Sequence, residues 1–251
     1  MKKLLTSELY KIWKNKIIFI MFTVILSYDL LYFGILYVEY YYGGKITTGA
    51  EAIVQKGFDE FLLIAIAVVI ANIVGIDFQT MAIKNVVAKG YSRQQIYFAK
   101  IIICMLVSVS TMVISRVIVV GLTVLVWGFD DTQIFTCTGV LLFSFTYTIL
   151  SASYGAVFVM LTFEAKSISR SIVYNVLFLI LCPLMLRIIG IIIGHDSILS
   201  DYYLVQCMEK MATYSPLAKD TWRCVFVFFI YTALSIYIGV FRFMRKDIKN
   251  L

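Results

Sequence analysis

Six long apolar segments alternate with short charged segments along the chain. A helix that crosses a lipid bilayer needs about 20 predominantly apolar residues. Three of the six segments contain no charged residue, and the other three contain one each. The segments cover residues 17–38, 61–76, 101–129, 132–163, 171–194 and 224–240. The pattern predicts an all-α polytopic membrane protein, in which residues 1–251 form a single transmembrane domain with six spanning helices.

The composition excludes a water-soluble enzyme. Hydrophobic residues make up 61% of the chain, charged residues make up 15%, and the mean hydropathy is +0.91. A soluble domain is roughly 45–50% apolar and about 25% charged, so a soluble globule could not bury this much apolar surface. The 14 glycines and 2 prolines are too few for a fibrous or disordered chain.

The basic residues gather in particular connections. Lys and Arg number 22 against 15 Asp and Glu, which gives a net charge of +7. Most of the basic residues lie in 1–16, 77–100, 164–170 and 241–251, whereas most of the acids lie in the other connections. Cytoplasmic connections of membrane proteins are enriched in Lys and Arg. We therefore expect both termini to be cytoplasmic, and the net charge requires no nucleic-acid partner.

Residues 1–16 predict a helix that lies on the inner leaflet. Leu5, Leu9, Ile12 and Trp13 fall on one helical stripe, and Lys2, Lys3, Thr6, Lys11 and Lys14 largely occupy the other faces. Such a helix buries its apolar stripe among the lipid headgroups. It is either a simple anchor or an elbow helix that also packs against a cytoplasmic partner. No small-residue cleavage site follows the first apolar segment, so we expect that segment to be retained as a spanning helix.

The connection 77–100 predicts two helices separated by a tight break. Gly90 occupies a position where a helix commonly ends in the left-handed conformation. Ser92 and Gln95 match the capping box that begins a new helix. We expect the first helix to cover roughly 79–89. It would pack with Ile83 and Val87 and keep its polar side at Lys84, Asn85 and Lys89. By itself this pattern is also compatible with an ordinary amphipathic connector.

The same connection resembles a segment of the ABC-2-type permeases. The resemblance lies in an acid-Phe pair followed by Thr, Lys-Asn, Gly, Ser-Arg and a later Lys. The matching residues are Asp77, Phe78, Thr80, Lys84, Asn85, Gly90, Ser92, Arg93 and Lys100. Many members carry Gly before the Thr, whereas this chain has Gln79. The basic N-terminal helix and the six spans extend the resemblance to the whole chain.

The resemblance implies a fold and a set of partners. In the family, the segment matching residues 77–93 contains the coupling helix, which docks into a cleft of a separate ATPase subunit. The fold would include an N-terminal elbow helix and short outer re-entrant helices. A transporter of this kind pairs the permease with a second permease, as a homodimer or heterodimer, and with two ATPase chains in a bacterial cell membrane.

Hydrolytic chemistry is absent from the sequence. No GxxxxGK[ST] phosphate loop occurs, and the only histidine, His195, has no catalytic partner pattern. We expect no cofactor in this chain, with ATP and Mg²⁺ bound by the partner ATPase. The five cysteines form neither a CxxC pair nor a Cys/His cluster, so we interpret them as small buried hydrophobic residues.

Three charged residues lie inside the apolar segments. A charge at the bilayer centre costs about 2.5–3.5 kcal/mol on insertion scales, so Asp29, Arg116 and Arg187 indicate a functional or paired site. At 1.5 Å per residue from the inner face, Asp29 lies near mid-membrane and both arginines lie further out. An Asp29–Arg116 ion pair is our hypothesis. The three residues either hold the bundle together or line a translocation path.

Two outer connections are expected to contain short helices. Thr48 and Glu51 match a capping box in the first of them, and Ser215-Pro216 matches a helix start in the loop 195–222. We expect the helices of the loop 195–222 to re-enter the membrane in part.

The chain is most similar to small ABC-2 permeases of peptide export and bacteriocin immunity, such as phenol-soluble-modulin exporters and lantibiotic-immunity permeases. Amphipathic or antimicrobial peptides are the expected substrates, and hydrophobic drugs or lipid-like compounds are the alternative. The rival class is an ion-coupled carrier or a structural membrane component. An ion-coupled carrier favours internal repeats and broken helices, and neither stands out in this sequence.

Overall fold

The structure is a computed structural model that describes residues 1–43, 60–128, 137–193, 202–204, 206–207 and 218–245. Over these residues every long element is a helix, which confirms the predicted fold class. The elements are α1 (Lys2–Lys14), α2 (Lys16–Val38), η1 (Glu39–Gly43), α4 (Glu60–Gln79), α5 (Ala82–Ala88), α6 (Arg93–Trp127), α7 (Cys137–Ala165), α8 (Ile168–Ile193) and α11 (Ala218–Arg245). Six of the described helices are long and apolar enough to cross a membrane.

Several helices extend beyond the apolar segments that predicted them. Helix α6 begins at Arg93, before the apolar segment that starts at residue 101, because Ser92 caps it; the predicted capping box with Gln95 is confirmed. Helix α11 covers Ala218–Arg245, where the apolar segment covers only 224–240. An apolar run marks the part of a helix that lipid can cover, whereas caps decide where the helix begins.

The short helix α5 begins later than predicted. It covers Ala82–Ala88 instead of 79–89, because α4 continues through Gln79. Met81 then adopts a left-handed backbone with φ of 54°, which separates the two helices. The predicted break after α5 is confirmed, since Gly90 has φ of 88°.

Helices α4 and α7 form the centre of the bundle. Helix α4 contacts α7, α8, α2 and α6, and its side chains from Leu62 to Phe78 are mostly buried. Two glycines allow close helix packing. A Cβ atom at Gly75 would lie 2.9 Å from Ile168, and one at Gly155 would lie 3.2 Å from the carbonyl oxygen of Cys104. The core is therefore tight where α4 meets α8 and where α7 meets α6.

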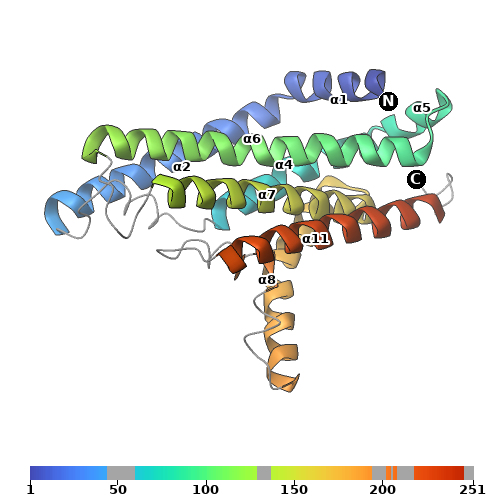
Figure 1. Ribbon diagram of the computed structural model, residues 1–251. Coiled ribbons are helices and arrows are strands. Elements are labelled where there is room, and N and C mark those ends of the chain that lie inside the picture. The colour runs from blue at the N-terminus through green and yellow to red at the C-terminus, as the bar shows by residue number, and fades with distance from the viewer. Residues whose placement is uncertain (44–59, 129–136, 194–201, 205, 208–217, 246–251) are drawn as a thin grey trace.

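Helix α8 leaves the bundle. Figure 1 shows α2, α6, α7 and α11 running along the long axis of the molecule, while α8 points away from them. The helix contacts α4 and α7, but its second half exposes a series of aliphatic side chains. These are Leu184, Met185, Ile188, Ile189, Ile191, Ile192 and Ile193.

Most of the predicted outer features lie outside the described residues. These features are the capping box at Thr48 and Glu51, the single histidine His195, and the helix start at Ser215-Pro216. The first five residues of α11 lie in the predicted outer loop 195–222, which is a correction to that boundary.

Candidate functional site

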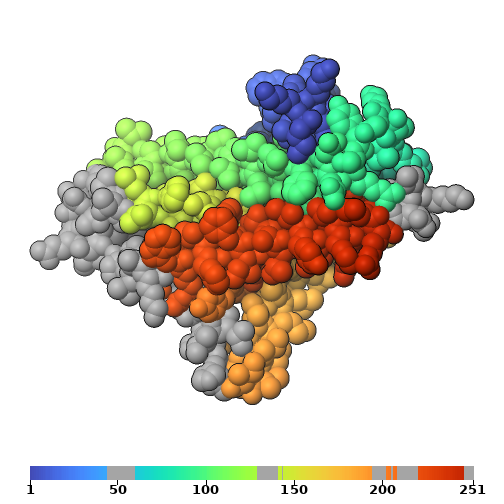
Figure 2. All heavy atoms as spheres, turned by 45° about the vertical axis from the view of Figure 1, so that its right-hand side comes forward, coloured from blue at the N-terminus to red at the C-terminus, as the bar shows by residue number. Residues whose placement is uncertain are grey.

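The candidate site lies at the end of the bundle that holds α5, which we call the α5 end. Helix α1, helix α5, the start of α6 and the last turn of α11 all lie at this end (Figure 1). Figure 2 shows α1 as a ridge that rises above α6 beside α5. The predicted coupling segment, residues 77–93, is therefore next to the predicted elbow helix.

Two hydrophobic clusters hold α5. Ile83 is buried and belongs to the main core. Val86 and Val87, on the same helical face as Ile83, pack against a small cluster of Leu4, Ile96 and their neighbours. One face of α5 thus packs on the bundle and on the cluster that includes α1. As predicted from its pattern, Ile83 and Val87 pack inward.

The polar edge of α5 faces outward. Asn85 and Lys89 are exposed, and Lys84 is half-buried. These side chains are the ones that α5 can present to another protein. A helix of seven residues is too short to span a membrane. With one face packed on the protein and polar side chains exposed on the other, α5 is suited to contact another protein.

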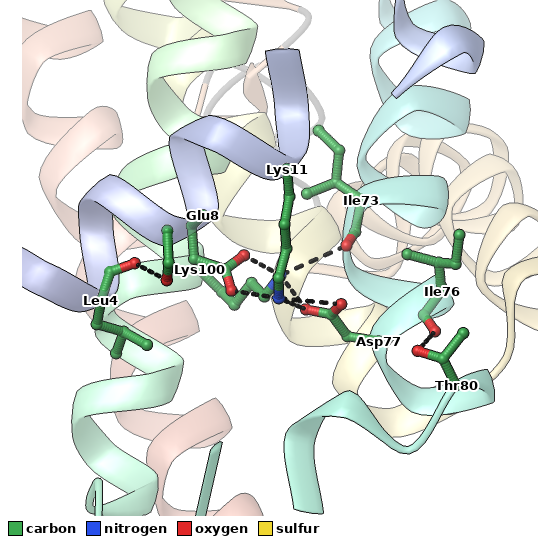
Figure 3. Close-up of polar contacts among 9 residues, drawn as sticks. Leu4, Glu8, Lys11, Ile73, Ile76, Asp77, Thr80 and Lys100 are labelled. Atoms are coloured by element: carbon green, nitrogen blue, oxygen red, sulfur yellow. Dashed lines mark hydrogen bonds and ion pairs between the residues drawn. The ribbon is translucent and has the colours of Figure 1, made fainter. Parts of the chain in front are cut away.

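Four charged residues meet where α1, α4 and α6 come together, and we call them the charge cluster: Glu8, Lys11, Asp77 and Lys100. Lys100 forms ion pairs with Glu8 and Asp77 (Figure 3). The Lys11 Nζ atom lies 2.7 Å from a Glu8 carboxylate oxygen and 3.1 Å from one of Asp77. The cluster joins three helices, since the residues come from α1, α4 and α6.

Three of the four residues in the charge cluster are buried. Glu8 is 3% exposed, Asp77 is 4% exposed and Lys100 is 1% exposed, while Lys11 is exposed at the rim. Two carboxylates and two ammonium groups have cancelling formal charges. Burying an ion pair requires desolvation of both partners, and the pair persists only where the geometry compensates. The cluster therefore holds its three helices in one relative position.

The sequence pattern alone does not mark Glu8 as a site residue. Glu8 is the only acidic residue among residues 1–16, and Lys11 follows it at a helical spacing of three. A single acidic residue in a strongly basic helix is the signal that could have indicated an ion-pair partner on another helix. Its partner, Lys100, is 92 residues away, so the pairing itself required the fold.

The packing face of α1 overlaps the predicted stripe only in part. Leu4 is buried against the bundle, and Leu5 and Ile12 of the stripe are half-buried there. Leu9 is 51% exposed and Trp13 is 74% exposed, so this part of the stripe faces outward. An exposed Leu and Trp on a basic helix are suited to the membrane interface.

Other residues of the coupling segment also act within the bundle. Phe78 is buried, and its ring packs edge-on against Phe163 with centroids 5.2 Å apart. The Thr80 hydroxyl donates to the carbonyl of Ile76 at 2.8 Å. Arg93 reaches the last turn of α11, where it donates to the carbonyl oxygens of Phe243 at 3.2 Å and Met244 at 3.1 Å.

The three intramembrane charges lie in different surroundings. Asp29 is fully buried and accepts a hydrogen bond from Ser115 at 3.0 Å. Arg116, the next residue of α6, is also buried, and its guanidinium lies 4.3 Å from the ring centroid of Tyr147. Arg187 is exposed on α8. The structure thus brings Asp29 to the turn of α6 that carries Arg116, and the ion pair between them stays a prediction.

A groove of about 620 Å³ opens beside Arg116, between α6 and α7. Its lining is mainly apolar, with Val117, Gly121 and Phe145 among its residues. Ser144 adds a hydroxyl to this lining. The groove therefore combines an apolar surface with a buried cation at its edge.

These features define a class of protein. Six described helices long and apolar enough to span a membrane, with a short amphipathic helix between the second and the third, define a polytopic membrane protein. A family model described as ABC-2 family transporter protein matches residues 4–182, which is more than half of the chain. The chain belongs to the ABC-2 transporter family. It is a multi-pass membrane permease subunit of an ABC transporter, and membership implies an ABC ATPase partner. No curated protein matches the chain.

Proposed function

We propose that the chain is the permease of an ATP-driven exporter of amphipathic or antimicrobial peptides. ATP and Mg²⁺ bind to a separate ATPase, and no cofactor binds to this chain. Two ATPase chains and a second permease complete the transporter. The observation that carries the proposal is the position of α5, which packs one face on the main core and on the cluster that includes α1 and leaves Asn85 and Lys89 exposed.

The proposed orientation places the α5 end in the cytoplasm of a bacterium. The connections that meet at this end are the basic ones, including residues 1–16 and 77–100. The opposite end carries an aromatic cluster, in which the Tyr40 ring lies 5.5 Å from that of Trp127. Basic connections favour the inner side, and Trp and Tyr favour both interfaces.

The groove between α6 and α7 supports an amphipathic substrate. An apolar lining accepts the hydrophobic face of a peptide, and Arg116 with Ser144 offers a polar contact at the same place. Hydrophobic drugs or lipid-like compounds remain the second candidate, because the lining is mostly apolar. Asp29, Arg116 and the exposed Arg187 are the residues that we propose for the path.

The exposed half of α8 supports pairing with a second permease. Its aliphatic side chains need a cover of lipid or protein. Site-specific cross-linking through a cysteine at Ile188 tests this contact in membranes. Cross-linked dimers support this contact, and a chain that stays monomeric after cross-linking contradicts it.

Co-purification with a separately encoded ATPase tests the function. We expect the full chain to capture the ATPase and to stimulate ATP hydrolysis. The variant Lys84→Ala/Asn85→Ala should lose both effects, because it removes polar groups from the free edge of α5. The matched control is Arg170→Ala, which changes an exposed basic residue at the start of α8. A double variant that behaves like the wild type would contradict docking through α5.

Reconstituted vesicles separate the substrate candidates. We expect ATP- and ATPase-dependent uptake of a fluorescent amphipathic helical peptide into inside-out vesicles, with sensitivity to vanadate. Uptake of a hydrophobic dye but not of the peptide would favour the second candidate. Transport by the purified chain alone, driven by a proton gradient, would contradict the proposed function.

A further inference from the structure

We propose that the charge cluster joins α1 to the elements that move when an ATPase docks at α5. We call the cluster the clasp, and we call α1, α5 and the adjoining ends of α4 and α6 the coupling lever. Glu8 and Lys100 are the positioning residues of the clasp. The inference rests on the proposed function, since it concerns how docking at α5 reaches the spanning helices. Nothing in the family match assigns a role to Glu8, which lies on a different helix from the coupling segment.

The clasp closes the base of the coupling segment. Asp77 lies in the last turn of α4, before α5, and Lys100 lies near the start of α6, after α5. Their ion pair connects the residue before the segment that contains α5 with the residue after it. The Nζ atom of Lys100 also lies 3.5 Å from the carbonyl oxygen of Ile73, one turn earlier on α4. A displacement of α5 therefore acts on α4 and α6 together.

Glu8 attaches α1 to this base. The Glu8 carboxylate contacts Lys100 through one oxygen and Lys11 through the other (Figure 3). One turn away, Leu4 packs with Ile96 and with Val86 of α5. Helix α1 thus contacts both the docking helix and the third spanning helix. Contiguous packed and ion-paired elements of this kind are the physical means by which a movement is transmitted.

The charges indicate a role beyond holding the fold. A buried ion pair replaced by apolar residues is often as stable as before, so stability alone does not require this cluster. The variant Glu8→Met/Lys100→Met tests that distinction, because it leaves Lys11 and Asp77 as a neutral pair. The variant Glu8→Lys/Lys11→Glu/Asp77→Lys/Lys100→Glu exchanges all four charges and so keeps every acid-base contact of the cluster.

The first experiment uses the full chain alone in lipid nanodiscs, so that its outcome is independent of any ATPase. Hydrogen exchange is measured for residues 2–14 and 82–88. We expect the Glu8→Met/Lys100→Met variant, the Met pair, to accelerate hydrogen exchange in both segments by about tenfold without a change in unfolding temperature. The variant with exchanged charges should restore slow hydrogen exchange. Lys14→Met, at an exposed position of α1, is the control and should have no effect. Unchanged exchange of residues 2–14 in the Met pair would overturn the clasp.

The second experiment adds the captured ATPase. The Met pair should bind it as the wild type does, since α5 is intact, and should transport about tenfold less substrate per ATP hydrolysed. The charge exchange should restore that ratio. A wild-type ratio in the Met pair would overturn the role of α1 in the lever. Failure of the wild type to capture any ATPase would contradict the proposed function, and the first experiment would still decide the clasp.

Discussion

The hydroxyl of Tyr97 donates a hydrogen bond to the carbonyl oxygen of Ser235 at 2.9 Å, which ties the start of α6 to the middle of α11. Tyr97 is fully buried, and its ring packs edge-on against Phe163 with centroids 4.8 Å apart. Gly239 lies one turn beyond Ser235 and leaves room for the phenol. A glycine in α11 thus allows a polar contact between two helices at the α5 end.

Gly239→Ala should destabilise the bundle. The added methyl group would occupy the position of the Tyr97 hydroxyl, so the ring must move. We expect a loss of about 1–3 kcal/mol, the usual magnitude for overpacking, measured as a lowered unfolding temperature in detergent. Gly121→Ala, where no atom lies within 4 Å of the added carbon, is the control. An equal loss in both variants would contradict the steric reason.

Arg93→Ala should loosen the end of α11. Arg93 supplies two hydrogen bonds to carbonyl groups of the last turn, which have no helical partner of their own. Hydrogen bonds from a charged donor contribute about 1.5–3 kcal/mol each, so hydrogen exchange near Phe243 should accelerate. Exchange in α2 serves as the internal reference. Protection that is unchanged at Phe243 would show that other contacts hold this turn.

Lys100→Met should be the most damaging single change in the charge cluster. It leaves the Glu8 and Asp77 carboxylates buried together, with only the exposed Lys11 to compensate them. Removing one partner from a buried ion pair costs about 3–5 kcal/mol. Lys11→Met should cost no more than about 1 kcal/mol, because that ammonium is solvated. The two unfolding temperatures measured side by side check this ranking, and equal losses would refute it.

Asp29 and Arg116 should show thermodynamic coupling. Either Asp29→Asn or Arg116→Met changes the charge balance among buried groups of α2 and α6, so each should lower stability and transport. The exchange variant Asp29→Arg/Arg116→Asp should recover part of both losses. Losses that simply add in the exchange variant would contradict an ion pair and would favour separate roles in the path.

Ser115→Ala tests the hydrogen bond that Ser115 donates to Asp29. The substitution removes a donor at 3.0 Å from a fully buried carboxylate. We expect a loss of about 1–3 kcal/mol in stability, since a buried carboxylate loses a hydrogen-bond donor. Ser110→Ala, whose hydroxyl donates only to its own helix at Val107, is the control. A neutral Ser115→Ala would show that this bond does not hold Asp29 in place.

Local chemistry determined much of the fold. Apolar runs of spanning length predicted six helices because a bilayer permits few other structures. The break at Gly90 and the cap at Ser92 were predictable, since both depend on residues within one turn of the chain. The inward packing of Ile83 and Val87 followed from helical spacing alone. The start of α5 was predicted too early, because nothing in the local pattern stops α4 before Gln79.

Only the tertiary structure decided which distant residues meet. Leu5, Leu9, Ile12 and Trp13 form the apolar stripe of α1, yet Leu9 and Trp13 are exposed while the bundle buries Leu4 and Glu8. Lipid and protein both cover apolar surface, so hydrophobicity does not distinguish the two faces of an interfacial helix. The pairing of Glu8 with Lys100 depends on a separation of 92 residues, and no periodic pattern encodes it. The six helices follow from the sequence through local physics, and the charge cluster that joins three of the described helices exists only because the fold brings them together.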